Sequence, residues 1–408
     1  MVNRSSLILS VCCLTMLVIL GCRSDDSRPD GQEMTIPQSN DVTVVDPVHV
    51  LLKADLVVPQ LTRESGINEI EKVRRGPDGE WVILNHLPRN NITELLIFAG
   101  NGAFQHRIRG SFDGPGNFTD LNDFLISGDT LELFDGVQNK RVLYTIDGQF
   151  IGENRFYPDV SQIIKLKDDL YAVYRGNAYQ YAHQFQESDN LVMVDQQGKV
   201  QAKGGVNMLP AMRDNVLTAN AFRSTLREEV FFLPPAKNII YAYQASSSTW
   251  EPYLYIQQPN QEEREQALQQ IADLPPASRK FDILQFLNAH DRWIPNFRNY
   301  TCSKNYLILN YAQAGKGVFA IYDLTQRKVQ SFTFSPNLLG NYYLLFLQND
   351  LVLFALTNPY YLWEQLQRYP DVARQLAPVF DQWEGEPNPL FISLPLDTFV
   401  DILLDQAS

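Results

Sequence analysis

The chain has 408 residues, a formal net charge of −13, and 45% apolar residues, which is enough to form a large core. An acidic chain without a long basic run disfavours binding to nucleic acids or anionic lipids, because phosphate contacts need clustered Lys and Arg. Its length allows two or three domains, but all-β folds often reach this size as one unit.

The first 21 residues have the pattern of a secretory signal. Arg4 supplies the positive charge, and residues 7–20 form an apolar run that is short for a membrane span, which needs about 20 residues. The run ends in Ile19-Leu20-Gly21-Cys22, which resembles the lipobox of bacterial lipoproteins and predicts a diacylglycerol on the Cys22 thiol. The alternative is an ordinary secretory signal that happens to contain a cysteine.

Residues 22–41 are rich in Pro, Ser, Gly and Gln and are predicted to form a flexible tether. The acidic pair Asp25-Asp26 resembles the surface-export signal of some lipoproteins. We therefore expect a lipid-anchored protein of the bacterial outer membrane, facing either the periplasm or the outside. Cys302 is the only cysteine after Cys22, so the folded body is expected to contain no disulfide.

Residues 111–153 contain the unit that the rest of the chain repeats, short strands joined by tight turns. Gly114-Pro115-Gly116 marks one turn, and Asp147-Gly148 suits a two-residue type I′ hairpin, which needs positive φ at both positions. Recurrence of the unit favours a radial array, a β-propeller, over an antiparallel sandwich.

A family resemblance rests on the runs GPGNF, LNDFLI and LELFDGVQNKRVLYTIDGQFI. They resemble the uncharacterised six-bladed β-propeller lipoproteins of Gram-negative bacteria, relatives of NHL-repeat propellers. Residues 386–394, EPNPLFISL, resemble the closing segment of that family. The resemblance covers most of the mature chain and implies the fold and the lipid anchor, but no catalytic residue. The chain departs from the family pattern near residues 179–187 and in two helical inserts.

We predict an all-β, six-bladed propeller over residues 42–408, in which a strand at residues 42–52 completes the last blade. Such closure protects the edge strand of an otherwise open ring. Two short helical inserts are expected, at residues 262–289 and 361–383, and a terminal helix at 399–404. The predicted blades occupy residues 67–109, 118–152, 160–204, 216–256, 294–334 and 340–394.

No catalytic or metal-binding motif is found in the sequence, which lacks Gly-x-Ser-x-Gly, His-Glu-x-x-His and EF-hand spacing. Polar side chains on the inner strands could instead bind an anion, ordered water or a metal ion such as Ca²⁺, or simply be solvated. Aromatic residues on a long connection could stack on sugars or peptides, or pack on one another. The channel candidates are Arg74, Arg75, Asn122, Gln162, Asn296 and Arg298, and the aromatic candidates are Tyr179, Tyr181 and His183.

These features favour a non-enzymatic envelope protein that binds a peptide, a glycan or a protein partner through its rim or channel. Its membrane contact would be the N-terminal lipid, and neither a cofactor nor a nucleic acid is expected. The alternative is a metal-dependent hydrolase or lyase with its site in the channel. A structural subunit of a larger outer-membrane assembly is a third possibility.

Overall fold

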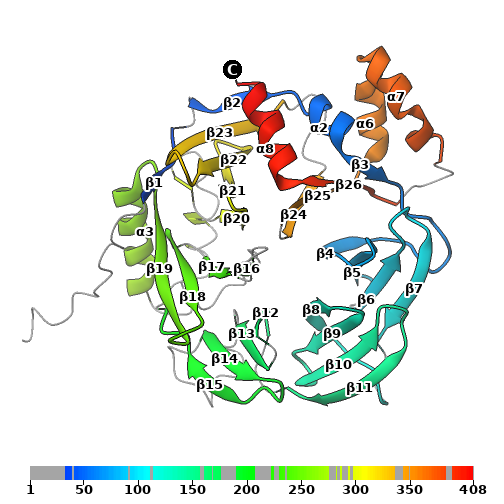
Figure 1. The fold of residues 1–408 in the computed structure, drawn as a ribbon, viewed down its shortest axis with the longest axis vertical. Helices are drawn as coiled ribbons and strands as arrows, with labels where there is room; N and C mark the ends of the chain where they lie inside the picture. Colours follow the sequence, from blue (N-terminus) through cyan, green and yellow to red (C-terminus); the bar gives the residue numbers. More distant parts are fainter. Residues whose placement is uncertain are drawn as a thin grey trace, which may run out of the picture.

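A computed structural model describes the chain as six sheets arranged radially around a central axis (Figure 1). The predicted six-bladed propeller is therefore confirmed. The described residues are 33–38, 41–90, 92–110, 114–156, 160–167, 169–175, 190–206, 222–224, 229–234, 237–274, 282, 285–286, 293–294, 297–335, 343–348, 350–382 and 388–407.

Within each blade, consecutive antiparallel strands run from the axis outward. The first three blades are β4 (Glu69–Arg75), β5 (Trp81–Leu87), β6 (Ile92–Phe98) and β7 (Phe104–Arg109); β8 (Leu121–Ser127), β9 (Thr130–Asp135), β10 (Lys140–Thr145) and β11 (Phe150–Arg155); and β12 (Gln162–Lys167), β13 (Leu170–Tyr174), β14 (Leu191–Asp195) and β15 (Val200–Lys203). The next two blades are β16 (Phe222–Ser224), β17 (Val230–Phe232), β18 (Ile239–Gln244) and β19 (Thr249–Gln257); and β20 (Phe297–Cys302), β21 (Tyr306–Gln313), β22 (Lys316–Asp323) and β23 (Lys328–Phe334). Blade six combines β24 (Tyr343–Gln348), β25 (Leu351–Leu356) and β26 (Leu390–Pro395) with the N-terminal β3 (Asp55–Val57).

The middle strands of a blade are apolar on both faces, because each blade packs against a neighbour on either side. In β5, Trp81, Val82 and Ile83 are all fully buried. The predicted hairpin turn at Asp147-Gly148 is present, but only Gly148 has a positive φ, of 78°. The turn is therefore not type I′: the Gly148 N–H donates to the Thr145 carbonyl at 2.9 Å, and the Thr145 N–H donates to the Gln149 carbonyl at 2.8 Å.

The ring is closed by β3, which pairs antiparallel with β26. A closing N-terminal strand is thus confirmed, but the range predicted for it, residues 42–52, is wrong. Those residues form β2 (Thr43–Val45), which pairs in parallel with β23 outside blade five, and the helix α2 (Val48–Lys53). The apolar run of α2 is short, and such a run suits a strand and a buried helical turn equally well.

The predicted tether also contains structure. The strand β1 (Glu33–Thr35) pairs in parallel with β19 outside blade four. Met34 and Ile36 are 0% and 2% exposed, because side chains two residues apart lie on the same face of a strand. Flexibility is therefore a wrong prediction for these residues. We call the described part of residues 33–57, which passes outside blades four, five and six in turn, the N-terminal belt.

Four further helices have clear positions. The predicted inserts contain α3 (Gln261–Asp273) after blade four, and α6 (Pro359–Leu366) and α7 (Pro370–Phe380) within blade six. The last helix, α8 (Leu396–Asp405), crosses blades five and six, whereas α6 and α7 stand outside the ring (Figure 1). None of the described helices is long and apolar enough to cross a membrane.

Candidate functional site

Three inner strands bring two cations and one carboxylate together near the axis. Asp123 on β8 is 1% exposed and forms ion pairs with Lys72 and Arg74 of β4. The Arg74 Nη2 atom lies 3.2 Å from Asp123 Oδ1, and Asp123 Oδ2 accepts a 3.0 Å hydrogen bond from the backbone N–H of Ile163 on β12. One carboxylate therefore links blades one, two and three. We call Lys72, Arg74 and Asp123 the inner-wall cluster.

Strand alternation explains why both cations reach the same carboxylate. Lys72 and Arg74 are two residues apart on β4 and therefore project from the same face, toward blade two. Val73, between them, projects from the other face into the core shared with blade six. The guanidinium of Arg74 also lies over the ring of Phe124, with Cζ 5.3 Å from the ring centroid, a cation–π distance.

The electrostatics of the cluster favour an ionised carboxylate. Burial alone would raise the pKa of Asp123, but Lys72, Arg74 and the N–H of Ile163 outweigh burial and hold that pKa below its ordinary value. Because both cations bind one carboxylate, the cluster carries a net positive charge at neutral pH.

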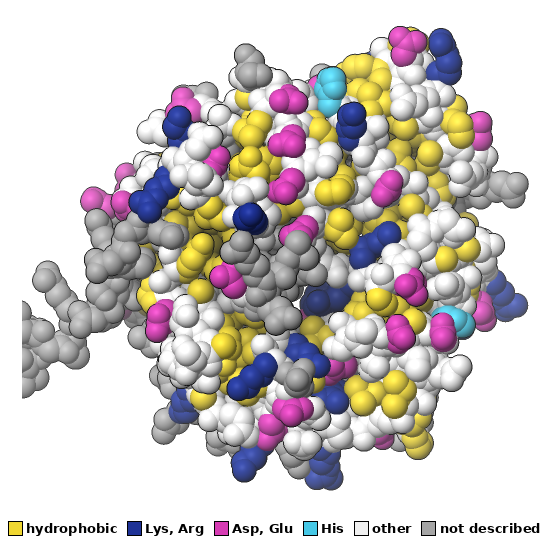
Figure 2. All heavy atoms as spheres, in the orientation of Figure 1, with side chains coloured by type: hydrophobic (Ala, Val, Ile, Leu, Met, Phe, Trp, Pro, Cys, Tyr) yellow, Lys and Arg dark blue, Asp and Glu magenta, His cyan; other side chains and the backbone are white. Residues whose placement is uncertain are grey.

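The cluster also remains partly open to solvent. The side chains of Lys72 and Arg74 are 14% and 25% exposed, and Arg74 Nε is buried without a hydrogen-bond partner. Lys165 and Lys167 lie further along β12. Figure 2 shows Lys and Arg side chains around the centre of the ring, on a chain whose net charge is −13. This surface suits an anionic group.

Two of the predicted channel residues make structural contacts. The Arg75 guanidinium stacks over Trp81 at 4.1 Å, and the Arg75 backbone N–H donates to Gln348 Oε1 at 2.7 Å, joining blade one to blade six. Loss of hydration lowers the pKa of Arg75. Asn122 Oδ1 accepts a 2.8 Å hydrogen bond from the N–H of Gly136 and holds the turn between β9 and β10.

The other predicted residues are less informative. Gln162 begins β12 and is half-buried beside Ile163. The backbone of Arg298 lies in β20, but its side chain is outside the described part of the structure. Also outside it are Cys22, Tyr179, Tyr181, His183 and Asn296.

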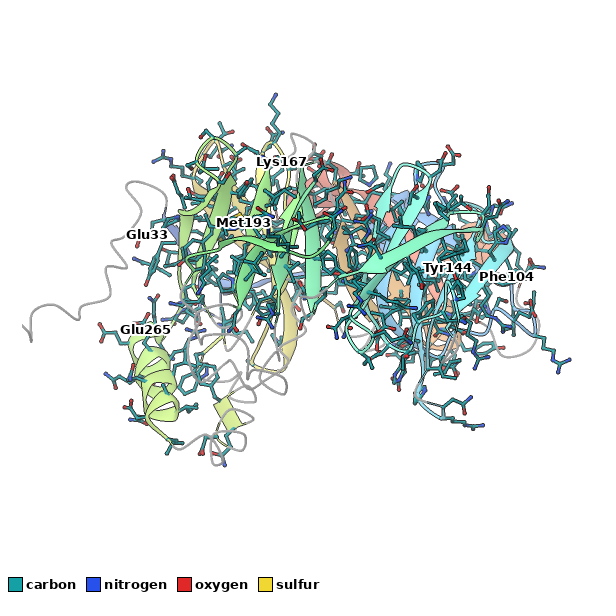
Figure 3. The ribbon with its side chains drawn as sticks, turned by 90° about the horizontal axis from the view of Figure 1, so that it is seen from below. Glu33, Phe104, Tyr144, Lys167, Met193 and Glu265 are labelled. Atoms are coloured by element: carbon teal, nitrogen blue, oxygen red, sulfur yellow. The ribbon has the colours of Figure 1, made fainter. Side chains whose placement is uncertain are left out.

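Sequence reasoning identified Arg74 and missed Lys72, Asp123, Lys165 and Lys167. Two signals were present in the sequence. Lys72 alternates with Arg74, and Asp123 is a charge inside the apolar run LNDFLI, where a carboxylate is stable only if it is paired. Figure 3 shows Lys167 and Glu265 of α3 on opposite faces of the ring, so this end of β12 lies on the face away from α3.

A second titratable cluster lies where β4 begins. His86 Nδ1 is 3.2 Å from Glu69 Oε2. Loss of hydration raises the pKa values of Glu71 and Asp120, and nearby carboxylates raise them further, while His86 opposes the increase. Carboxyl groups with raised pKa values are candidates for a functional site. Among the described residues, however, no group of three or more His, Cys, Asp or Glu could hold a metal ion.

The comparisons with known proteins support the fold. A family model described as "Domain of unknown function (DUF4934)" matches residues 62–392. A solved structure from Bacteroides fragilis NCTC 9343, named "Putative exported protein", is similar to this chain with a TM-score of 0.66 at 16% identity, covering 89% of this chain and 99% of that one. A DUF4221 family member from Bacteroides vulgatus has a TM-score of 0.47 at 10% identity, covering 84% and 99%. No curated protein matches the chain.

The predicted six-bladed propeller is thus supported by the solved structure from Bacteroides fragilis, and the matched family is one of unknown function. That its members are lipoproteins stays a prediction. The relationship to NHL-repeat propellers stays a prediction.

Proposed function

Since this chain belongs to the family of unknown function that its residues 62–392 match, we propose that it is a lipid-anchored envelope protein that binds a ligand without catalysis. The ligand presents an acidic group, a carboxylate, sulfate or phosphate on a glycan or peptide, to the central channel. The family match supports only the propeller, and the inner-wall cluster carries the proposal for the ligand.

The argument for an acidic ligand is electrostatic. Lys72 and Arg74 both bind the buried Asp123 carboxylate, and both side chains remain partly in solvent. A charged site between low-dielectric walls concentrates ions of opposite sign. The orphaned Arg74 Nε is a further donor that a ligand or an ordered water could satisfy.

The location follows from Cys22 and its lipobox, with support from the printed name of the Bacteroides fragilis protein. Metabolic labelling with a fatty acid tests the anchor directly. Label should enter the full-length protein and be absent from a Cys22→Ala variant. Equal labelling of both proteins would contradict acylation at this position.

A binding experiment tests the ligand. The triple variant Lys72→Gln, Arg74→Gln, Asp123→Asn removes the whole cluster without leaving an unpaired buried carboxylate. We expect acidic glycans and peptides to bind the soluble body and the triple variant to bind them about tenfold more weakly or worse, because each charge-assisted hydrogen bond contributes about 1.5–3 kcal/mol. Neutral analogues should bind neither protein.

Arg374→Gln is the matched control, since that side chain is 81% exposed on α7, outside the ring. It should bind as the wild type does. Equal affinity of the wild type and the triple variant would refute a role for the inner-wall cluster. Steady turnover of any bound compound would instead favour the enzymatic alternative.

A further inference from the structure

The N-terminal belt fixes the place at which the chain leaves the propeller. Met34 is fully buried in the core between blades four and five. Glu33 pairs with Tyr255 and Thr35 with Gln257 along β19, and the Ile36 N–H donates to the Gln257 carbonyl at 2.8 Å. The chain is therefore held against blade four from Glu33 onward.

This early attachment shortens the link to the lipid. Cys22 and Glu33 are eleven Cα steps apart, which spans at most about 36–40 Å when fully extended. A tether running to residue 42 would have twenty steps and span about 66–72 Å. The belt therefore removes nearly half of the reach that the sequence suggested.

The attachment also lies on one side of the ring. Figure 3 shows Glu33 and Glu265 at one edge and Phe104, at the start of β7, at the opposite edge. Figure 1 likewise shows β1 and α3 across the ring from β7. A short link fixed to one edge limits how far that edge can lie from the membrane, whereas the opposite edge has no such limit.

We infer that the acylated protein holds the outer edge of blade four toward the lipid surface and presents the opposite edge of the ring, formed by blade one, away from it. This inference rests on the lipid anchor proposed above. Glu262, Glu263 and Glu265 on α3 are exposed at the membrane-side edge. Anionic headgroups repel carboxylates, so blade four is held near the surface by the link and does not adhere to it.

Energy transfer from the protein to a headgroup-labelled lipid tests the orientation. The acylated, full-length protein is placed on phosphatidylcholine vesicles with a single dye at Glu265→Cys or at Gln105→Cys, beside Phe104. Both variants carry Cys302→Ser, which removes the one buried native thiol. We expect roughly twofold or more higher transfer from position 265, because the link reaches only about 40 Å from the attached edge.

A variant with a longer link tests whether the short link causes the difference between the two edges. Inserting twenty Gly and Ser residues between residues 32 and 33 should bring the two transfer values together. Equal transfer from positions 265 and 105 before the insertion would overturn the inference. Glu263 and Asn101 are also exposed at these two edges. Glu263→Cys and Asn101→Cys are therefore alternative dye positions if one of the first two variants does not fold.

A Cys22→Ala protein distinguishes failure of the anchor from failure of the orientation. It should not bind the vesicles at all. If it binds as the wild type does, the proposed anchor is wrong and the inference falls with it. If only the acylated protein binds but shows no difference between the two edges, the anchor stands and the orientation alone is wrong.

Discussion

Blades one to three differ from blades four to six in what joins neighbouring sheets. Between the early blades the contacts include charges, namely the inner-wall cluster and a second network in which Glu132 accepts a 2.9 Å hydrogen bond from the Tyr171 hydroxyl and lies 3.7 Å from Arg141 Nε. Between blades five and six the contacts are aromatic, with Phe399 of α8 packed against Phe319 and Phe354.

The outer edges differ in the same way. In blades four and five, β1 and β2 cover the outermost strand of the meander, and in blade six β3 completes the sheet. In the part of the chain that the structure describes, no strand is added outside β7, β11 or β15. Among the described residues, the N-terminal belt and α8 meet in the second half, where Gln406 bonds the backbone of Asp46. Buried apolar side chains therefore join the blades at which the ring closes. The inner-wall cluster lies between blades that take no part in the closure.

The largest expected effect comes from opening the aromatic contact in the closing half. Phe399 is fully buried, with its ring centroid 5.5 Å from that of Phe319 and 6.0 Å from that of Phe354. Phe399→Ala should lower the free energy of unfolding by about 3–5 kcal/mol, through lost transfer energy and the cavity left behind. Urea denaturation measures this. Phe150→Ala on β11, 43% exposed, is the control and should cost about 1 kcal/mol or less. Similar losses for both would mean that α8 does not hold the closure.

A smaller loss is expected in the charged half. Asp123→Asn leaves Lys72 and Arg74 without their carboxylate, and because both cations are partly solvated the cost should be about 2–3 kcal/mol at neutral pH. Asp371→Asn, 96% exposed on α7, should cost nothing measurable.

The pH dependence of that loss follows from the pKa of Asp123, which is lower in the folded protein than in the unfolded chain. The stabilisation is then complete above the unfolded value of about 3.9 and is lost as the pH falls through the folded value. Urea denaturation of the wild type and of Asp123→Asn at a series of pH values should show a constant difference near neutrality that shrinks below about pH 4. A difference that grows in acid would show that Asp123 is not stabilised as a carboxylate.

How well the sequence predicted the structure also differs between local and non-local features. Blades one and three, predicted at residues 67–109 and 160–204, begin and end within two residues of those bounds, because apolar runs and adjacent turn residues mark their strands locally. The closing strand Asp55–Val57 has only three residues, and its partner β26 lies more than 300 residues away. Nothing local identifies such a strand, so the prediction fell on the longer apolar run before it.

The candidate site shows the same limit. The inner-strand position of Arg74 was predictable, but its partner Asp123 belongs to another blade and only the assembled ring brings them together. Arg75 was predicted to line the channel, but Trp81 on the adjacent strand determines where its guanidinium lies. A residue's place in the repeat can thus be predicted, whereas its partner across two blades cannot.

The attachment of the belt can be broken without unfolding the ring. Met34→Asp places a carboxylate in an apolar core and should release β1 at a cost of about 1–2 kcal/mol, by local rather than global unfolding. Hydrogen exchange should then accelerate in β1 and at the outer edge of β19, while the early blades keep their protection. Thr35→Asp, whose side chain is exposed on the same strand, is the control and should leave exchange unchanged. Faster exchange throughout the ring would show that the belt belongs to the global folding unit.

The smallest effect is expected where the chain ends meet. Gln406 Oε1 accepts a 2.8 Å hydrogen bond from the Asp46 N–H, and Gln406 Nε2 donates to the Asp46 carbonyl at 3.3 Å. Gln406→Ala should cost about 0.5–1.5 kcal/mol, since α8 keeps its buried face. Gln382→Ala at the exposed end of α7 is the control.

Combining Gln406→Ala with Met34→Asp shows whether the belt acts as one unit. The two sites lie in different parts of the belt, β1 and the residue that follows β2, so independent attachments should give additive losses to within about 0.5 kcal/mol in urea denaturation. A combined loss clearly smaller than the sum would mean that releasing β1 already frees Asp46. The covered edges of blades four and five would then form a single cooperative element. The tether in the double variant would be no longer than in Met34→Asp alone, because Asp46 would already be released in the single variant.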